Sequence, residues 1–171
     1  HPKANELART QFQSQIKRYK LLNKPIIYID ESGFAHDMPR THGYTLKGQR
    51  CYGTKDWGAK GRTNVIGALI GKALLCTCLL NCNVDSEVFH TCVTQQLLPM
   101  TPKSSVIVMD NATFHKRTDT QNAITGAGHT LEFMPAYSPD LNPIEHKWAQ
   151  AKAVRRATGC SVEQLFNSQS I

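Results

Sequence analysis

Two short runs of apolar, β-branched residues constrain the fold of this chain more than any other feature, and each run ends in an aspartate. The first run is IIYID, residues 26–30, and the second is SSVIVMD, residues 104–110. Runs of this composition fill strands that are buried on both faces. Ligands of open α/β sheets collect at the carboxyl ends of the strands, so the two runs predict a site that contains Asp30 and Asp110.

The other elements follow from periodicity and turn residues. Apolar residues at near-helical spacing predict helices over residues 4–20, 84–100, 116–125 and 143–159. Two strands joined at Gly71-Lys72 are predicted within residues 64–81, and HTLEFM predicts a last strand over residues 129–134. After the first helix the order is strand, hairpin, helix, strand, helix, strand, helix. A mixed α/β sheet with flanking helices and a hairpin before parallel strands is what a ribonuclease-H-like fold requires.

Length and composition limit the classes of protein that the chain can belong to. Its 171 residues suffice for one domain with a core, and no apolar run reaches the roughly 18 residues of a membrane span. The net charge of +7 and the pI near 9.2 suit a polyanionic partner such as nucleic acid. The chain opens on His1-Pro2-Lys3 without a signal-peptide pattern, so we expect a fragment of a longer protein.

The six cysteines give little sign of a metal site. They lack paired C-x-x-C spacing and lie mostly among apolar residues. The grouping of Cys76, Cys78 and Cys82 allows a soft-metal site, but two cysteines on one face of a strand are more often small buried residues. We expect reduced thiols in a cytoplasmic protein.

The stretch MPAYSPDLNPIEHKW, residues 134–148, places Glu145 at the start of the last helix. With Asn142 as N-cap and Pro143 as the first helical residue, Glu145 takes the third position, where a capping-box glutamate reaches back to the cap. In the same way Asp30 and Asp110 can simply cap the turns that follow them. A helix N-terminus also favours an ionised carboxylate, so the loop can equally present Glu145 to a ligand.

A cation is the physical reason for gathering three carboxylates. Together they repel one another and raise their pKa values unless hard divalent cations occupy the space between them. Two Mg²⁺ ions held in this way support phosphodiester chemistry. Asp30, Asp110 and Glu145 therefore form the predicted metal set, and it needs neither cysteine nor histidine.

Three motifs carry a resemblance to a known family. YIDESGF around Asp30, VIVMDNATFH around Asp110, and MPAYSPDLNPIEHKW around Glu145 resemble the DDE transposases of the mariner superfamily, in particular the bacterial insertion-sequence branch. Between Asp110 and Glu145 lie 34 residues, a spacing that is similar to this branch. The segment GYTLKGQR also resembles the family, and the likeness covers residues 24–158.

The resemblance implies a function and a set of partners. Asp30, Asp110 and Glu145 would be the catalytic, metal-binding triad, with two Mg²⁺ ions in the presence of substrate and Mn²⁺ as a substitute. The reaction would be DNA strand cleavage at transposon ends, followed by attack of the freed 3′-hydroxyl on target DNA, commonly at a TA dinucleotide. The partners would be transposon ends, target DNA and a second copy in a homodimer, in the bacterial cytoplasm and at the nucleoid.

The resemblance also divides the chain. Residues 1–24 would be an N-terminal linker helix and residues 25–171 the catalytic domain. Family members carry N-terminal helix-turn-helix domains that read the terminal repeats, and this chain does not contain them. End-specific recognition is therefore not expected from these residues alone.

Several other residues are candidates for supporting roles. Glu31 follows Asp30 directly and is expected to point to the opposite side of the strand, as a structural residue and not a ligand. Asn111 orients Asp110 or makes the turn. Trp148 is expected in the core more than in base stacking. The predicted DNA contacts are Lys47, Arg50, His115, Lys147, Lys152 and Arg156.

Two of the predicted DNA contacts also have purely structural explanations. His115 can equally be a loop histidine that only forms hydrogen bonds. A DNA track from aromatic and basic residues between positions 40 and 62 can equally be a solvated surface.

Two other functions compete with the leading hypothesis. The chain could be a cleavage-incompetent transposase remnant that binds DNA or pairs with an intact copy, although all three carboxylates are present. It could also be another ribonuclease-H-fold nuclease acting on RNA hybrids or branched DNA, against which the SPDLNPIE context counts.

Overall fold

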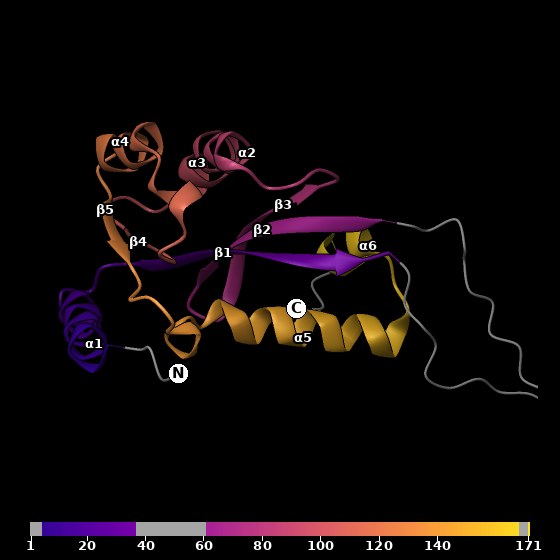
Figure 1. Ribbon diagram of the computed structural model, residues 1–171, viewed down its shortest axis with the longest axis horizontal. Helices are drawn as coiled ribbons and strands as arrows, with labels where there is room; N and C mark the ends of the chain where they lie inside the picture. Colours follow the sequence, from indigo (N-terminus) through magenta and orange to yellow (C-terminus); the bar gives the residue numbers. More distant parts are fainter. Residues whose placement is uncertain (1–4, 37–60, 168–170) are drawn as a thin grey trace, which may run out of the picture.

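The computed structural model describes residues 5–36, 61–167 and 171, and the strands among them form one mixed sheet of five strands. The strands are β1 (Ile26–Ala35), β2 (Arg62–Ile70), β3 (Ala73–Leu80), β4 (Val106–Met109) and β5 (Thr130–Phe133). Their order in the sheet is β3-β2-β1-β4-β5 (Figure 1). β1, β2 and β3 pair antiparallel, whereas β1, β4 and β5 pair parallel. β1 is therefore the strand at which the sheet changes from antiparallel to parallel.

Helices cover both faces of this sheet (Figure 1). One face carries a helical stretch made of α2 (Ser86–Cys92), a π-helical turn (Val93–Leu97) and α3 (Leu98–Met100), together with α4 (Thr118–Gly126). The other face carries α5 (Ile144–Thr158) and α6 (Val162–Asn167). Helix α1 (Glu6–Leu21) packs at the β4–β5 end, and short 3₁₀ turns occupy Thr113–Lys116 and Pro139–Leu141.

The alternation of side chains along the central strands fills a core on each face. Ile27 and Ile29 of β1 pack with Phe89 of α2 on one face. On the opposite face Val65 of β2 packs with Trp148 of α5. Strands buried on both sides need this near-continuous apolar composition, which is why the first and second apolar runs of the sequence became β1 and β4.

Most of the predicted elements are confirmed, with shifted ends. The hairpin turns at Gly71, whose φ of 59° lies in the left-handed region that glycine adopts without strain. The last helix ends at Gly159, also with positive φ, as predicted. Two predictions were incomplete, because β1 continues to Ala35 instead of ending at Asp30, and α6 follows where no element was expected.

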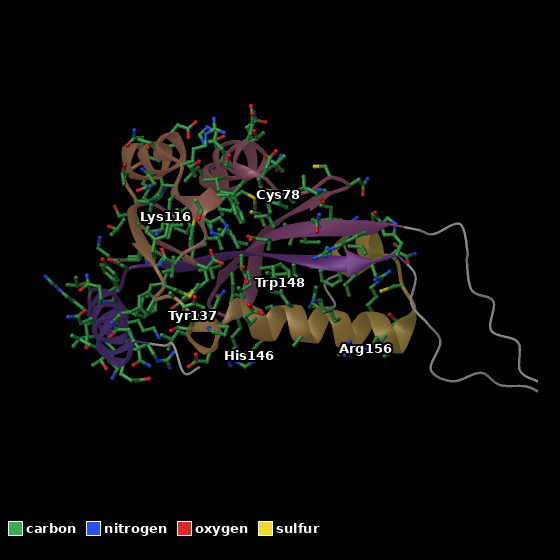
Figure 2. All side chains as sticks on the ribbon, viewed as in Figure 1. Cys78, Lys116, Tyr137, His146, Trp148 and Arg156 are labelled. Atoms are coloured by element: carbon green, nitrogen blue, oxygen red, sulfur yellow. A yellow bond between two sulfur atoms is a disulfide. The ribbon has the colours of Figure 1, made fainter. Side chains whose placement is uncertain are left out.

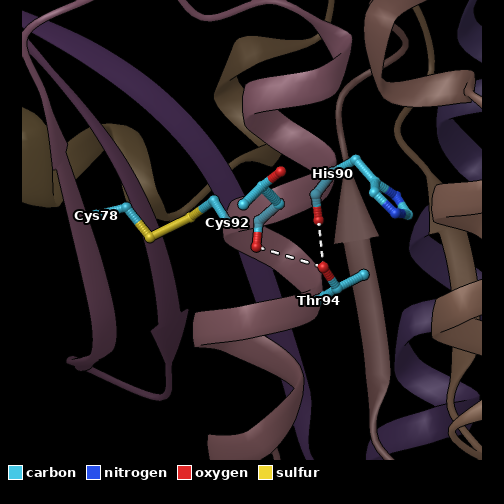
Figure 3. The surroundings of a disulfide bond; sticks show 5 residues. Cys78, His90, Cys92 and Thr94 are labelled. Carbon is cyan, nitrogen blue, oxygen red and sulfur yellow. Dashed lines mark hydrogen bonds between the residues drawn. A yellow bond between two sulfur atoms is a disulfide. The ribbon is translucent and has the colours of Figure 1, made fainter.

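The expectation of reduced thiols is wrong for one pair of cysteines. Cys78 of β3 forms a disulfide with Cys92 of α2 (Figure 3). Both side chains belong to the core cluster between the sheet and the α2–α3 stretch, so packing of the helix on the sheet brings them together. Cys76, Cys82 and Cys160 are free, and no zinc-type cluster forms among the described residues.

The helix that carries Cys92 changes its hydrogen-bonding pattern directly after the disulfide. The π-helical turn begins at Val93, and the Thr94 hydroxyl donates to the carbonyl oxygen of His90 at 2.9 Å (Figure 3). A π-helical turn inserts one extra residue and re-aims the helix that follows.

No helix within the described residues is long and apolar enough to cross a membrane.

Candidate active site

The register of the sheet brings the two strand aspartates together. In the parallel pairing of β1 with β4, Tyr28 lies opposite Val108. Asp30 stands two residues beyond Tyr28, and Asp110 stands two residues beyond Val108. Side chains two residues apart point to the same face of a strand, so the two carboxylates follow the same row of the sheet. Asp30 thus lies inside the long strand β1, at the level where β4 ends.

Asp30 is held by two neutral donors. Its side chain is only 7% exposed. Oδ2 accepts hydrogen bonds from the Asn142 amide at 3.2 Å and from the Trp148 indole N–H at 3.3 Å. Burial, followed by the negative charges of Glu31, Glu145 and Asp110, together raise the pKa of Asp30 to about 7. Neutral donors orient the carboxylate without supplying a positive charge to offset this repulsion.

A glycine makes room for the indole that reaches Asp30. Gly67 of β2 lies directly opposite Asp30 in the antiparallel pairing. A Cβ atom at this position would lie 2.4 Å from Cη2 of Trp148. Figure 2 shows Trp148 on the side of α5 that faces the sheet, while His146 lies on the other side. The absence of a side chain at Gly67 therefore leaves the space in which the Trp148 indole reaches Asp30.

Asp110 has a charged partner instead. Nδ1 of His115 lies 2.5 Å from Oδ1 of Asp110, and Nε2 of the same ring lies 3.1 Å from Oε2 of Glu31. The backbone N–H of Ala112 also donates to Asp110 Oδ1 at 2.9 Å. Burial raises the pKa of Asp110, but the His115 and Ala112 hydrogen bonds outweigh it and hold that pKa below its usual value.

The bridging histidine is a buried cation. Burial lowers the pKa of His115, yet hydrogen bonds to Asp110 and Glu31 raise it to about 9. Its side chain has no exposed surface, so it has no face to offer DNA. This burial disfavours the predicted DNA contact at His115 and favours the alternative of a histidine that only forms hydrogen bonds.

Glu31 does not point away from the site as expected. One carboxylate oxygen each from Asp30, Glu31 and Asp110 lie within 4.8 Å of one another, a grouping that can hold a metal ion. The longer Glu31 side chain reaches His115, which in turn contacts Asp110. Sequence reasoning missed this link because only the folded loop after β4 brings His115 beside β1.

Glu145 reaches the same cavity from the other layer. It is the second residue of α5 and is exposed. A cavity of about 400 Å³ is lined by Asp30, Asp110 and Glu145. The rest of its wall is formed by residues 111–112, residues 134–139 and Asn142. The negative charge of Glu145 contributes to the raised pKa of Asp30. The structure thus brings all three predicted carboxylates to one cavity.

The start of α5 differs from the predicted capping box. Pro143 has helical dihedrals, and Asn142 has the extended backbone of a cap residue. The Asn142 side chain, however, donates to Asp30, and no side-chain hydrogen bond caps the helix. Its amide oxygen is buried without a hydrogen-bond partner. The predicted cap is therefore replaced by a contact with the site.

The remaining predicted DNA contacts have varied surroundings. Lys152 lies half-buried with Nζ 5.5 Å from the centre of the Phe34 ring, and Lys147 Nζ donates to the Gln150 side chain at 3.1 Å. Arg156 is exposed. Lys47 and Arg50, with the GYTLKGQR segment, fall outside the described residues.

One residue on the same helix was not predicted to matter. Arg155 is buried, and its guanidinium donates to the backbone carbonyl oxygens of Ala35 and Cys160. It thereby fastens the last turns of α5 to the end of β1.

Comparisons with known proteins agree with this architecture. A family model described as a DDE superfamily endonuclease matches residues 25–165. No curated protein matches the chain. The crystal structure of the Mos1 strand transfer complex matches with a TM-score of 0.68 at 17% identity, covering 95% of this chain and 52% of that chain. The Mos1 mariner paired end complex with Mn matches with a TM-score of 0.62 at 19% identity, covering 87% and 48%.

The isolated catalytic domain of Mos1 mariner transposase also matches, with a TM-score of 0.58 at 14% identity and coverage of 90% and 71%. These matches confirm the predicted ribonuclease-H-like fold. The chain spans about half the length of the Mos1 chains in the two complexes.

Proposed function

The chain belongs to the DDE superfamily of endonucleases, and from this membership we propose that it is the catalytic domain of a cut-and-paste DNA transposase. The likeness to the Mos1 transposase structures supports this assignment within the superfamily. The motifs around Asp30, Asp110 and Glu145 favour the bacterial insertion-sequence branch of the mariner superfamily. The observation that carries the proposal is the convergence of these three carboxylates on one cavity.

The donor set fits a hard divalent cation. Every candidate ligand is a carboxylate oxygen, which is the donor type that Mg²⁺ and Mn²⁺ prefer. The raised pKa of Asp30 reflects burial beside three other carboxylates, and a bound cation would remove that penalty. We propose that Asp30, Asp110 and Glu145 hold two Mg²⁺ ions in the presence of substrate, with Mn²⁺ as a substitute. The Mos1 paired end complexes solved with Mn and with Mg support this choice.

Such ions, when bound, activate an attacking oxygen and stabilise a leaving one in phosphodiester chemistry. The protein's own contribution is to fix the ligands. Asn142 and Trp148 hold Asp30 through Oδ2, while His115 and the Ala112 amide hold Asp110 through Oδ1. Ligands fixed in this way need little reorganisation when the substrate arrives.

The substrate of this reaction would be DNA. We propose cleavage at transposon ends followed by transfer of the freed 3′-hydroxyl into target DNA. Candidates for phosphate contacts on α5 are the exposed Arg156 and the half-buried Lys147 and Lys152. Two further candidates are Lys47 and Arg50. Joining two ends implies a homodimer in the active complex, acting in the bacterial cytoplasm at the nucleoid.

The first experiment measures Mn²⁺ binding by calorimetry and cleavage of end-containing DNA in parallel. Asp110→Asn and Glu145→Gln should each weaken Mn²⁺ binding at least tenfold and abolish cleavage, because each removes a ligand charge. DNA binding should remain near wild type. Glu163→Gln, on the exposed surface of α6, serves as the charge-matched control and should change neither property.

Three results would reject the proposal. Undiminished Mn²⁺ binding in both variants would mean that the carboxylates do not share a cation. Wild-type protein that binds Mn²⁺ and DNA but never cleaves would favour the passive remnant, whereas preference for RNA hybrids over transposon ends would favour another nuclease of the same fold.

A further inference from the structure

Helix α1 lies outside the region that matches the family model, which begins at residue 25. It nevertheless packs on the domain through Phe12, Ile16 and Tyr19, all of which are buried. These side chains join a cluster with Met134, and Leu141 packs against the same cluster. Met134 begins the segment 134–139 that lines the carboxylate cavity. The apolar face of α1 therefore supports this cavity wall from behind.

A second contact ties α1 to the end of the same wall. The Arg9 guanidinium donates two parallel hydrogen bonds to Asp140, from Nη1 to Oδ1 at 2.9 Å and from Nη2 to Oδ2 at 2.6 Å. This two-bond geometry fixes orientation as well as distance. Asp140 sits in the 3₁₀ turn Pro139–Leu141. A third contact runs from the Tyr19 hydroxyl to the Glu132 carboxylate, just before the wall begins.

The turn gripped by Arg9 leads directly to the site. Asn142, which donates to Asp30, is the second residue after Asp140, and Glu145 follows three residues later. We propose that α1 is a positioning element of the carboxylate site, with Arg9 as the residue that fixes the turn carrying Asn142 and Glu145. This inference rests on the proposed metal-dependent function. It assigns a role in the site to a helix that the family match does not include.

A purely structural ion pair is the alternative. Asp140 is 62% exposed, and exposed pairs contribute little to global stability. The structural and the positioning interpretation predict different effects when the ion pair between Arg9 and Asp140 is removed. A structural pair alters only the unfolding midpoint, whereas a positioning pair alters the mobility of the turn and the affinity for the cation.

The experiment uses amide hydrogen exchange in the full chain without metal. The amides of Leu141 and Asn142 donate to the carbonyl oxygens of Ser138 and Pro139 within the turn, so they report its opening. In Arg9→Gln these two amides should exchange about two- to fivefold faster, the range that follows from loss of a partly exposed ion pair. Amides of β4 should keep their wild-type rates. Lys17→Gln, an exposed charge change on the same helix, is the matched control.

Mn²⁺ calorimetry on the same proteins completes the test. Arg9→Gln should weaken Mn²⁺ binding by a similar factor, and the exchanged pair Arg9→Asp with Asp140→Arg should restore both readouts. Unchanged exchange at Leu141 and Asn142 overturns the inference, as does faster exchange without weaker Mn²⁺ binding or an increase spread over the whole chain. Wild-type protein that fails to bind Mn²⁺ would reject the proposed function instead.

Discussion

Two aspartates at equivalent places in neighbouring strands have pKa values that are shifted in opposite directions. Asp30 and Asp110 follow the same register positions of β1 and β4, yet the pKa of Asp30 is raised and that of Asp110 is lowered. The difference lies in their partners. Asp30 is buried and receives only neutral donors, whereas Asp110 contacts the cationic ring of His115. At pH 7 the protein thus keeps Asp110 charged, whereas Asp30 is about half protonated.

Asp30 should destabilise the metal-free fold at neutral pH. Its pKa is about 7 in the folded protein and 3.8 in the unfolded chain, so the folded state binds the proton more tightly. Stability from this group is complete below pH 4 and is lost as pH rises through 7. We therefore expect the difference in unfolding free energy between Asp30→Asn and wild type to change by about 2 to 4 kcal/mol in favour of the variant from pH 4 to pH 8. Urea denaturation in the presence of a metal chelator measures this difference.

The pH dependence separates this effect from ordinary packing. The difference between Asp30→Asn and wild type should grow with pH and level off above 7. Glu163→Gln, at an exposed carboxylate of α6, controls for charge removal and should show no such trend. A difference that stays constant from pH 4 to pH 8 contradicts the raised pKa.

At the scale of elements, the sequence predicted the strands better than their ends. The runs ending at Asp30 and Asp110 became β1 and β4 because buried strands need continuous apolar residues. The extension of β1 to Ala35 was missed because Glu31, Ser32 and Gly33 lack an apolar pattern. Their pairing with β2 extends the strand, and β2 is distant in sequence. Tertiary pairing overrode local propensity there.

The same reason explains what was missed in the site. The approach of Glu145 to the aspartates followed from its motif, but the donors to Asp30 did not. Asn142 is a good N-cap by local rules, and only the docking of α5 on the sheet turns its amide toward β1. Likewise nothing local indicates that His115 bridges two carboxylates from different strands.

The contact between β2 and α5 depends on the absence of a side chain at Gly67. Gly67→Ala would place a Cβ atom 2.4 Å from the Trp148 ring, so the helix or the indole must move. Overpacking of this kind costs about 1 to 3 kcal/mol. We expect a lower urea midpoint together with weaker Mn²⁺ binding, because Trp148 also donates to Asp30.

Trp148→Phe removes the clashing atom, so the double variant should lose less than the sum of the two single changes. Gly126→Ala is the matched control, since a Cβ atom there meets nothing within 4 Å. Additive losses in the double variant, or equal losses at Gly67 and Gly126, would contradict the proposed contact.

At the scale of the whole molecule, the carboxylate cavity and the disulfide lie in different halves of the sheet. The parallel half, β1 with β4, and helix α5 supply the carboxylates, while the antiparallel half ends at β3. Residues of β3 are only half-buried except at its exposed start, and the disulfide from Cys78 to Cys92 fastens this strand to α2. The covalent link therefore reinforces the half of the molecule that lies away from the cavity.

Loss of the disulfide should lower global stability without changing cation affinity. A cross-link of sequence separation 14 stabilises by about 3 kcal/mol in the chain-entropy account. Cys78→Ser should lower the urea midpoint under oxidising conditions, and a reducing agent should bring wild type to the same midpoint. Cys82→Ser, at an exposed free thiol, is the control. An unchanged wild-type midpoint on reduction would mean that the bond does not stabilise the fold.

The scattering of the carboxylates along the chain also determines when the site comes into being. Asp30 lies near the beginning of the domain, Asp110 follows the fourth strand, and Glu145 stands roughly 115 residues after Asp30. At ordinary rates of synthesis this interval lasts on the order of ten seconds. Asp30 also lacks both of its donors until Asn142 and Trp148 have left the ribosome. A nascent chain therefore holds only two of the three carboxylates until Glu145 has been made, and the arrangement around Asp30 is complete only after the start of α5 has emerged.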